Sequence, residues 1–245
     1  VVFGNSQFIA VHTNGTAFSS ADGSNWISVA GAAAGQSFTG VDYANGQFIL
    51  FGSTGRFQTS ADGATWNTPR TNSTTALSSA AYAAGRWVIG GVNRCLTFTN
   101  STGSDQTATN MPASYTVTSV VGRTNLFVAG TSSIYPPAFS TNGLNWQYAN
   151  GLSDSIRSVA YGNGVFVAVG SHIQSSADGR AWTIRSANMP AAVQNGGVIA
   201  PAYTPFNDAA VFGDGKGRTR RVRLGPHRAI ATRSVICAQG STYFA

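Results

Sequence analysis

The side chains that could serve as acids or bases in a reaction are few in this sequence. All eight acidic residues are aspartates, and no glutamate occurs. Asp22, Asp62 and Asp178 occupy the same place in a recurring Ser-Ala-Asp-Gly-x-x-Trp element, so we expect equivalent turns and not one shared site. Glycoside hydrolysis ordinarily needs two carboxyl groups beside the scissile bond. The few aspartates that remain favour a protein that is not an enzyme, with a glycoside hydrolase kept as the third alternative.

Metal and cofactor chemistry has no better support from residue spacing. His12, His172 and His227 are isolated in sequence, and no His-x-His, Cys-x-x-Cys or Asp-x-Asp run occurs. The glycine-rich stretch 213–217 lacks the spacing of a phosphate-binding loop and is better interpreted as a tight turn. The sequence therefore predicts no metal site and no cofactor.

Basic residues are concentrated near the C-terminal end, where they account for most of the net charge of +7. Such a stretch can pair with an acidic protein, a polyanionic glycan or nucleic acid. Nucleic acid is the weakest of these partners because exposed aromatic residues are not interleaved with the arginines. The alternative is a solvated strand face without a partner. The candidate binding residues are Arg218, Arg220, Arg221, Arg223 and His227.

The elements that must position these residues form an internal repeat. An apolar opening segment begins at Val1, Val41, Ala80, Val120 and Val159. Within it one aromatic residue recurs every 39 or 40 residues, a period typical of propeller blades. The recurring aromatics are Phe8, Phe48, Trp87, Phe127 and Phe166.

Each repeat is predicted to form four short antiparallel strands. In the fifth copy, one hairpin turns at Asn163-Gly164 and the next at Asp178-Gly179, both favoured turn dipeptides. A single copy cannot bury both of its faces, so stacking in a ring is favoured. The predicted fold is all-β, a single β-propeller domain over residues 1–245 with about six four-stranded antiparallel blades and a possible incomplete seventh. The repeats span approximately 1–40, 41–79, 80–119, 120–158, 159–197 and 198–233, and 234–245 is a partial repeat or a set of ring-closing strands.

Composition adds limits on location. Charged residues make up 9% of the chain, against about 25% in an ordinary soluble domain, and Ser, Thr, Asn and Gly replace them. No run of 18 apolar residues could span a bilayer and no signal peptide is found, so we expect ends that were processed or cut from a longer polypeptide. Cys95 and Cys237 fall in repeats that are not neighbours, and we expect two buried free thiols.

The recurring turn elements resemble the Asp-box, or BNR, repeat of sialidase-like propellers, which is found in bacterial and phage surface proteins. The resemblance covers about five of the six repeats; the third copy lacks the Asp and the Trp, and the sixth is degenerate. It implies a structural turn in which the carboxylate binds backbone N–H groups while the Trp packs between blades. A sialidase would also need a glutamate that this chain lacks. The residues given this structural role are Asp22, Trp26, Asp62, Trp66, Asn142, Trp146, Asp178 and Trp182.

These observations favour a non-catalytic binding module that is extracellular or on a virion surface. The expected partner is a glycan or cell-surface receptor, bound by Arg, Asn, Asp and aromatic residues outside the repeat such as Tyr135, Tyr148 or Tyr203. The alternative is a structural component of a larger assembly, such as a phage tail or surface appendage, with neighbouring subunits as partners. The uncharged polar composition is familiar in phage tail proteins, virion spikes and secreted adhesins.

Overall fold

The computed structural model describes residues 1–12, 14, 16–29, 37–71, 75–99, 106–107, 115–132, 135–151, 153–186, 209–213 and 219–223. These residues form five antiparallel sheets of four strands and one two-stranded hairpin. In each four-stranded sheet the strands follow one another in chain order. The described part is thus all-β, as predicted, and it is built of repeated four-stranded units.

The strands of the five sheets have these bounds. The first sheet contains β1 (Val2–Gly4), β2 (Gln7–Val11), β3 (Ala17–Ser20) and β4 (Ile27–Ser28). The second contains β5 (Phe38–Ala44), β6 (Gln47–Gly52), β7 (Arg56–Ser60) and β8 (Arg70–Thr71). The third contains β9 (Leu77–Ala83), β10 (Arg86–Gly91), β11 (Arg94–Phe98) and β12 (Gln106–Thr107). The fourth contains β13 (Val117–Arg123), β14 (Leu126–Thr131), β15 (Ala138–Ser140) and β16 (Gln147–Tyr148), and the fifth contains β17 (Ile156–Gly162), β18 (Val165–Gly170), β19 (Ile173–Ser176) and β20 (Thr183–Ser186).

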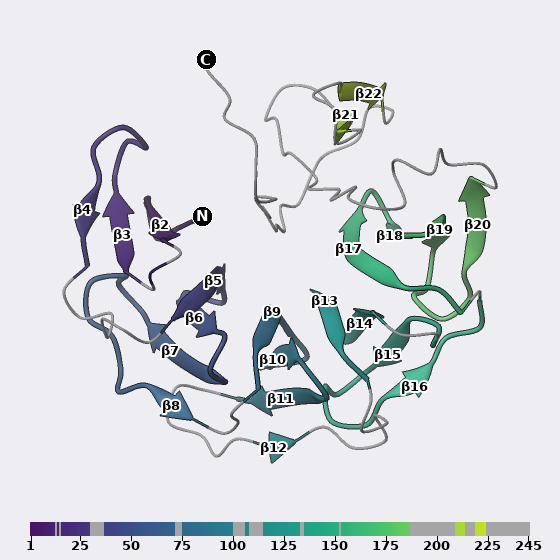
Figure 1. Ribbon diagram of the computed structural model, residues 1–245, viewed down its shortest axis with the longest axis horizontal. Helices are drawn as coiled ribbons and strands as arrows, with labels where there is room; N and C mark the ends of the chain where they lie inside the picture. Colours follow the sequence, from purple (N-terminus) through teal and green to yellow (C-terminus); the bar gives the residue numbers. More distant parts are fainter. Residues whose placement is uncertain are drawn as a thin grey trace.

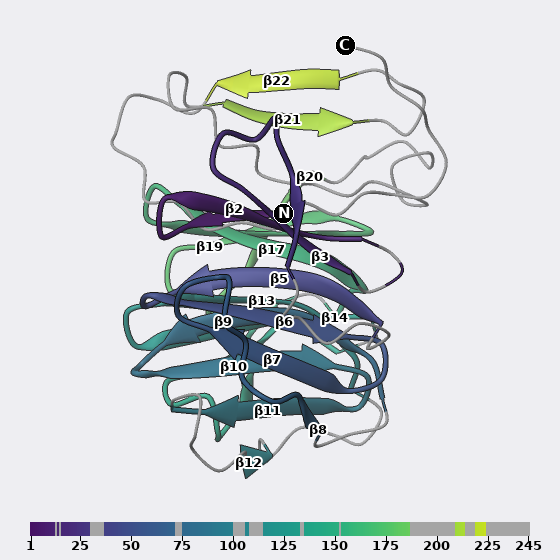
Figure 2. The same ribbon diagram turned by 90° about the vertical axis from the view of Figure 1, so that its left-hand side faces the viewer.

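The sheets are arranged along an arc, with the first strand of each sheet on the inner side and the fourth strand on the outer side (Figure 1). The inner strands β1, β5, β9, β13 and β17 contact one another in that order. The hairpin consists of β21 (Ala209–Gly213) and β22 (Thr219–Arg223), whose antiparallel pairing is visible in Figure 2. No helix that is long and apolar enough to cross a membrane occurs among the described residues.

The turn between the first two strands explains why each sheet begins as a tight hairpin. In the fifth sheet, β17 and β18 pair in register across Asn163 and Gly164, which have φ angles of 49° and 79°. Positive φ at both central residues matches the twist of the strands and suits Asn-Gly. Asn45 and Gly46 repeat this conformation in the second sheet. The hairpin predicted at Asn163-Gly164 is confirmed.

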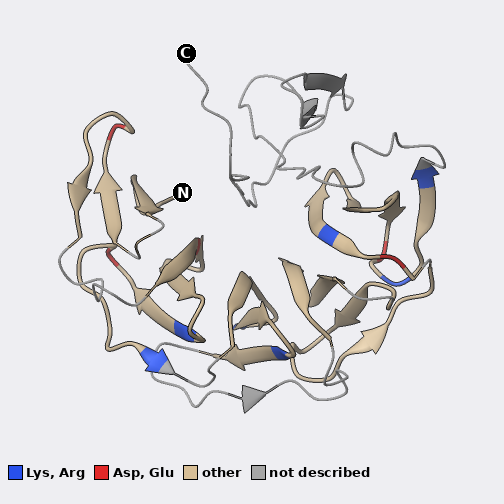
Figure 3. Cartoon of the chain, in the orientation of Figure 1, with Lys and Arg blue, Asp and Glu red and all other residues tan. Residues whose placement is uncertain are grey.

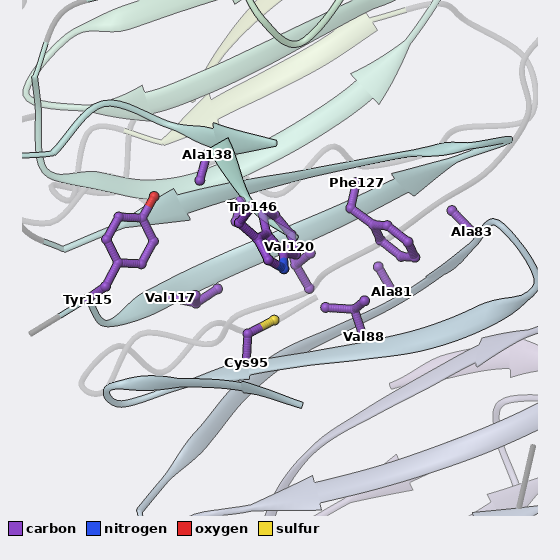
Figure 4. Packing of buried hydrophobic residues seen from close by; sticks show 11 residues of the cluster. Ala81, Ala83, Val88, Cys95, Tyr115, Val117, Val120, Phe127, Ala138 and Trp146 are labelled. Carbon is purple, nitrogen blue, oxygen red and sulfur yellow. The ribbon is translucent and has the colours of Figure 1, made fainter. Parts of the chain in front are cut away.

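The hydrophobic core is divided into clusters that lie between successive sheets. One cluster joins the third and fourth sheets and includes Cys95, Tyr115, Phe127 and Trp146 (Figure 4). Cys95 is a buried free thiol, and burial raises its pKa. The recurring aromatic residues of the second to fifth sheets are at most 1% exposed, and burying each such ring contributes roughly 1.5–3 kcal/mol. The repeat therefore places its largest side chains between sheets.

Hydroxyl groups also tie the inner strands together. Ser79 Oγ accepts a hydrogen bond of 3.0 Å from the backbone N–H of Val120. One repeat later, Ser119 Oγ accepts the equivalent bond of 3.1 Å from Val159 N–H. These serines are buried, so each bond satisfies polar groups that water cannot reach.

Candidate functional site

The recurring Ser-Ala-Asp-Gly element forms a compact turn between the third and fourth strands. In the second sheet, Asp62 Oδ1 accepts hydrogen bonds from the backbone N–H groups of Ala64 (2.9 Å) and Thr65 (2.7 Å). Ser60 Oγ donates to the same carboxylate oxygen and accepts from Gly63 N–H at 2.8 Å. Gly63 has a φ of +75°, which a residue with a Cβ adopts only under strain. We call this arrangement the aspartate turn.

The same pattern of bonds occurs in the first, fourth and fifth sheets, around Asp22, Asn142 and Asp178. In the fourth sheet the amide oxygen of Asn142 accepts bonds of 2.9 Å from the N–H groups of Leu144 and Asn145, as a carboxylate does elsewhere. Backbone N–H donors stabilise the ionised carboxylates and lower the pKa of each aspartate, to about 2 for Asp62. The residues assigned a structural role thus lie at equivalent turns, one in each of four sheets.

The tryptophan that ends each turn donates its indole N–H to the carbonyl oxygen of the turn glycine. Trp66, Trp146 and Trp182 are 8%, 2% and 8% exposed and belong to the clusters between sheets. Trp26 differs because it is 38% exposed, with its ring centroid 6.4 Å from that of Phe8. Three of the four tryptophans therefore pack between neighbouring sheets.

Three tyrosines that do not belong to the repeat meet at the rim of the fourth sheet. The rings of Tyr135 and Tyr148 stack with centroids 5.5 Å apart and planes 15° apart. The ring of Tyr115 lies 5.7 Å from the first and 5.8 Å from the second. Tyr148 is 40% exposed, Tyr135 is half-buried and Tyr115 is fully buried. We call Tyr115, Tyr135 and Tyr148 the tyrosine cluster.

Local sequence explains how the cluster is held. Pro136 and Pro137 follow Tyr135 and lack the N–H that a strand ladder needs, so β15 begins only at Ala138. Tyr115 donates its hydroxyl to the carbonyl oxygen of Pro136 at 3.3 Å. Figure 4 shows Tyr115 at the end of the core cluster opposite Phe127. Tyr115 is therefore an internal anchor on which the two outer tyrosines rest.

Burial raises the pKa of two of the three phenols, those of Tyr115 and Tyr148. Partial burial, followed by the neighbouring Tyr135, raises the pKa of Tyr148, and burial raises that of Tyr115 strongly. The surface is thus an uncharged aromatic face with hydroxyl groups at its edge. Such a face can pack against the C–H surface of a sugar ring or an apolar side chain. Among the three tyrosines named from the sequence, the structure brings Tyr135 and Tyr148 together, whereas Tyr203 lies outside the described residues.

Comparison with known proteins shows similarity of fold only. No family model and no curated protein matches the chain. The computationally designed protein Ika8 is 12% identical with a TM-score of 0.63, over 93% of this chain and 71% of that one. The WD40 repeats of RRP9 are 9% identical with a TM-score of 0.65, over 90% of this chain and 74% of that one. The described sheets therefore have a propeller-like arrangement.

The structure describes the backbone of only three of the five residues of the predicted basic site. Arg220, Arg221 and Arg223 lie on β22, where the backbone of Arg221 pairs with Val211 and that of Arg223 with Ala209. Arg218 and His227 lie outside the described residues. In the five sheets the charged residues are distributed along the arc (Figure 3).

One charged contact was missed by sequence reasoning. Asp154, which is buried, accepts a 2.9 Å hydrogen bond from the backbone N–H of His172, and its Oδ2 lies 3.2 Å from His172 Nδ1. The two residues are 18 positions apart and meet because β17 and β18 form a hairpin. Among the described residues no group of three or more His, Cys, Asp or Glu side chains could hold a metal ion.

Proposed function

We propose that this chain is a six-bladed β-propeller of the Asp-box type that serves as a non-catalytic attachment module for a glycan or a glycan-bearing receptor outside the cytoplasm. The sixth blade is inferred from the hairpin β21–β22. Its first strand ends in Gly213, as β6, β10 and β18 end in glycine, and the arginine-rich strand follows where β19 stands in the fifth sheet. Residues 234–245, predicted to be a partial repeat or a set of ring-closing strands, lie outside the described residues.

The observation that carries the proposed function is the tyrosine cluster. Tyr148 lies two residues after the tryptophan of its repeat. The equivalent positions in other repeats are Ser28, Thr68 and Ile184. A stacked pair with one ring 40% exposed is therefore not required by the repeated fold. Tyrosines that are rigidly held and open to solvent are common anchors of binding surfaces, since few rotamers are lost on contact. Charged residues make up only 9% of the chain, and this low charge suits hydroxyl-rich ligands.

A glycan array tests this proposal with two variants at equivalent positions. Tyr148→Ser installs the residue found in the first sheet, and Ile184→Ser removes an apolar residue that is 42% exposed at the matching place in the fifth sheet. Loss of an aromatic anchor costs more than about 1.4 kcal/mol, so we expect Tyr148→Ser to weaken binding about tenfold or more. The Ile184→Ser control should bind like the wild type.

Two outcomes would contradict the proposal: an array on which the wild type binds no glycan, or equal binding by wild type and Tyr148→Ser. A blank array would move the assignment to a structural component of a larger assembly. Measuring the array at low and high salt, beside a variant with Arg218, Arg220, Arg221 and Arg223 changed to Ser, separates specific recognition from attraction to the basic stretch.

A further inference from the structure

A groove with a volume of about 510 Å³ lies between the aspartate turns of the fourth and fifth sheets. It is separate from the tyrosine cluster, because Gln147 lines the groove while Tyr148, the next residue of strand β16, points to the other face of the sheet. Phe139, Thr141, Asn142, Asn145, Gln147 and Arg180 are among the residues that line it.

The internal repeat gives a reference for what the fold requires at each of these positions. The other three aspartate turns have alanine where the fourth has Thr141, and aspartate where it has Asn142. The amide oxygen of Asn142 keeps the bonds to backbone N–H groups, so the fold gains nothing from the exchange. A carboxylate makes stronger bonds to N–H groups than a neutral amide does. The turn itself therefore does not explain why Thr141 and Asn142 differ from the other repeats, whereas a role in the groove would.

The same comparison applies to the side chains that face each other across the groove. The Arg180 guanidinium lies 5.3 Å from the centre of the Phe139 ring, a cation–π contact between two sheets. At the position of Arg180 the other turns have Ser24, Ala64 and Leu144, and at that of Phe139 other sheets have small hydroxyl residues. Both Phe139 and Arg180 thus differ from the residues at equivalent positions in other repeats, and the two differing residues contact each other.

The charge of the groove follows from these exchanges. Arg180 is the one ionisable residue among those that line it. The nearby carboxylate of Asp178 is bound within its own turn by the N–H groups of Arg180 and Ala181 and does not line the groove. Within the described part of the chain, no carboxylate forms an ion pair with Arg180. An aspartate at position 142 would place a negative charge beside this arginine, and Asn142 avoids it.

We propose that this groove is a second ligand site that binds a carboxylate-bearing sugar. Arg180, held by the Phe139 ring, receives the carboxylate through its planar N–H groups. The neutral side chains of Thr141, Asn142 and Gln147 bind hydroxyl groups of the ring. This site stands on the fourth and fifth sheets alone and does not depend on the tyrosine cluster.

The test uses uronate oligosaccharides and their carboxyl-reduced counterparts, titrated by calorimetry into the full chain. The variants take their residues from other repeats, so that the turns remain foldable: Arg180→Ala copies Ala64, and Asn142→Asp copies the other three turns. Arg157→Ala, which removes an exposed arginine of β17 outside the groove, is the charge-matched control. Thermal melts establish that each variant is folded.

We expect at least one uronate to bind about tenfold or more tightly than its carboxyl-reduced form. Arg180→Ala should abolish that preference, Asn142→Asp should weaken uronate binding several-fold, and Arg157→Ala should leave it unchanged. Absence of uronate binding, equal binding of the reduced forms, or full binding by Arg180→Ala would overturn this site. Uronate binding that survives Arg180→Ala but is lost in Tyr148→Ser would also overturn the groove site, and it would instead support ligand binding at the tyrosine cluster.

Discussion

Gln174 offers a quantitative test of how the sheets are packed. Its side chain is completely buried on β19, and neither Oε1 nor Nε2 has a hydrogen-bond partner among the described residues. Burying an amide without partners costs about 1–3 kcal/mol by comparison with protein mutants. Gln174→Met keeps the length of the side chain and removes both polar atoms. We expect the free energy of unfolding to rise by about 1–3 kcal/mol, or the melting temperature by roughly 2–10 °C.

The second sheet provides the matched control. Gln58 stands at the same place in β7, two residues before the serine of the aspartate turn, and is 2% exposed. Its Nε2 donates a 2.7 Å hydrogen bond to the carbonyl oxygen of Asn67. Gln58→Met leaves that oxygen without its donor, so we expect a loss of about 1–3 kcal/mol. The same substitution should therefore have opposite effects at the two positions.

Urea denaturation followed by tryptophan fluorescence measures both variants against the wild type. The reasoning would be refuted by Gln174→Met losing as much stability as Gln58→Met. That result would mean that the Gln174 amide makes hydrogen bonds in solution, for example through a buried water.

Two further predictions concern the aspartate turns. The pKa of Asp62 is about 2 in the folded chain against 3.8 for an unperturbed aspartate, so its ionisation stabilises the fold above about pH 4 and this contribution is lost as pH falls through 2. Asp62→Asn, which copies Asn142, should thus lose less stability than the wild type between about pH 5 and 2 in urea titrations; equal losses would contradict the pKa assignment. In the same assay, Gly179→Ala should destabilise the fold more than Gly164→Ala. Both glycines have positive φ, so either substitution costs about 1–2 kcal/mol. Only at Gly179 would the new Cβ also lie 2.6 Å from Val128, which adds about 1–3 kcal/mol. Equal effects would show that the turn moves to accept the methyl group.

The repeat predicted the strands well because their determinants are local. Asn163-Gly164 fixes a hairpin within a few residues of itself, and alternation in the flanking strands decides which side chains are buried. Tyr135 and Tyr148 could be named because they stand out from the repeat. Tyr115 could not be added to them, because it precedes the first strand of the sheet whereas Tyr135 and Tyr148 lie at the third and fourth strands, and the three rings meet only in the folded sheet.

Contacts between sheets were beyond sequence reasoning for the same reason. Phe139 and Arg180 each look like surface residues of separate repeats, and their contact depends on how far one sheet is rotated against the next. The difference between Gln58 and Gln174 is likewise invisible in sequence, because both are glutamines in similar strands. Only the three-dimensional neighbours decide which of them is satisfied.

The serine bonds between inner strands have a consequence for how such a chain can evolve. Ser79 with Val120 and Ser119 with Val159 form the same contact one repeat apart, so the fourth sheet presents one surface to the third sheet and a different, complementary surface to the fifth. A head-to-tail interface of this kind accepts any further copy of the unit without new complementarity. Duplication of the repeat that holds Ser119 would therefore keep this serine bond at the new joint. Ligand specificity can then diverge in one copy while the others keep the scaffold intact.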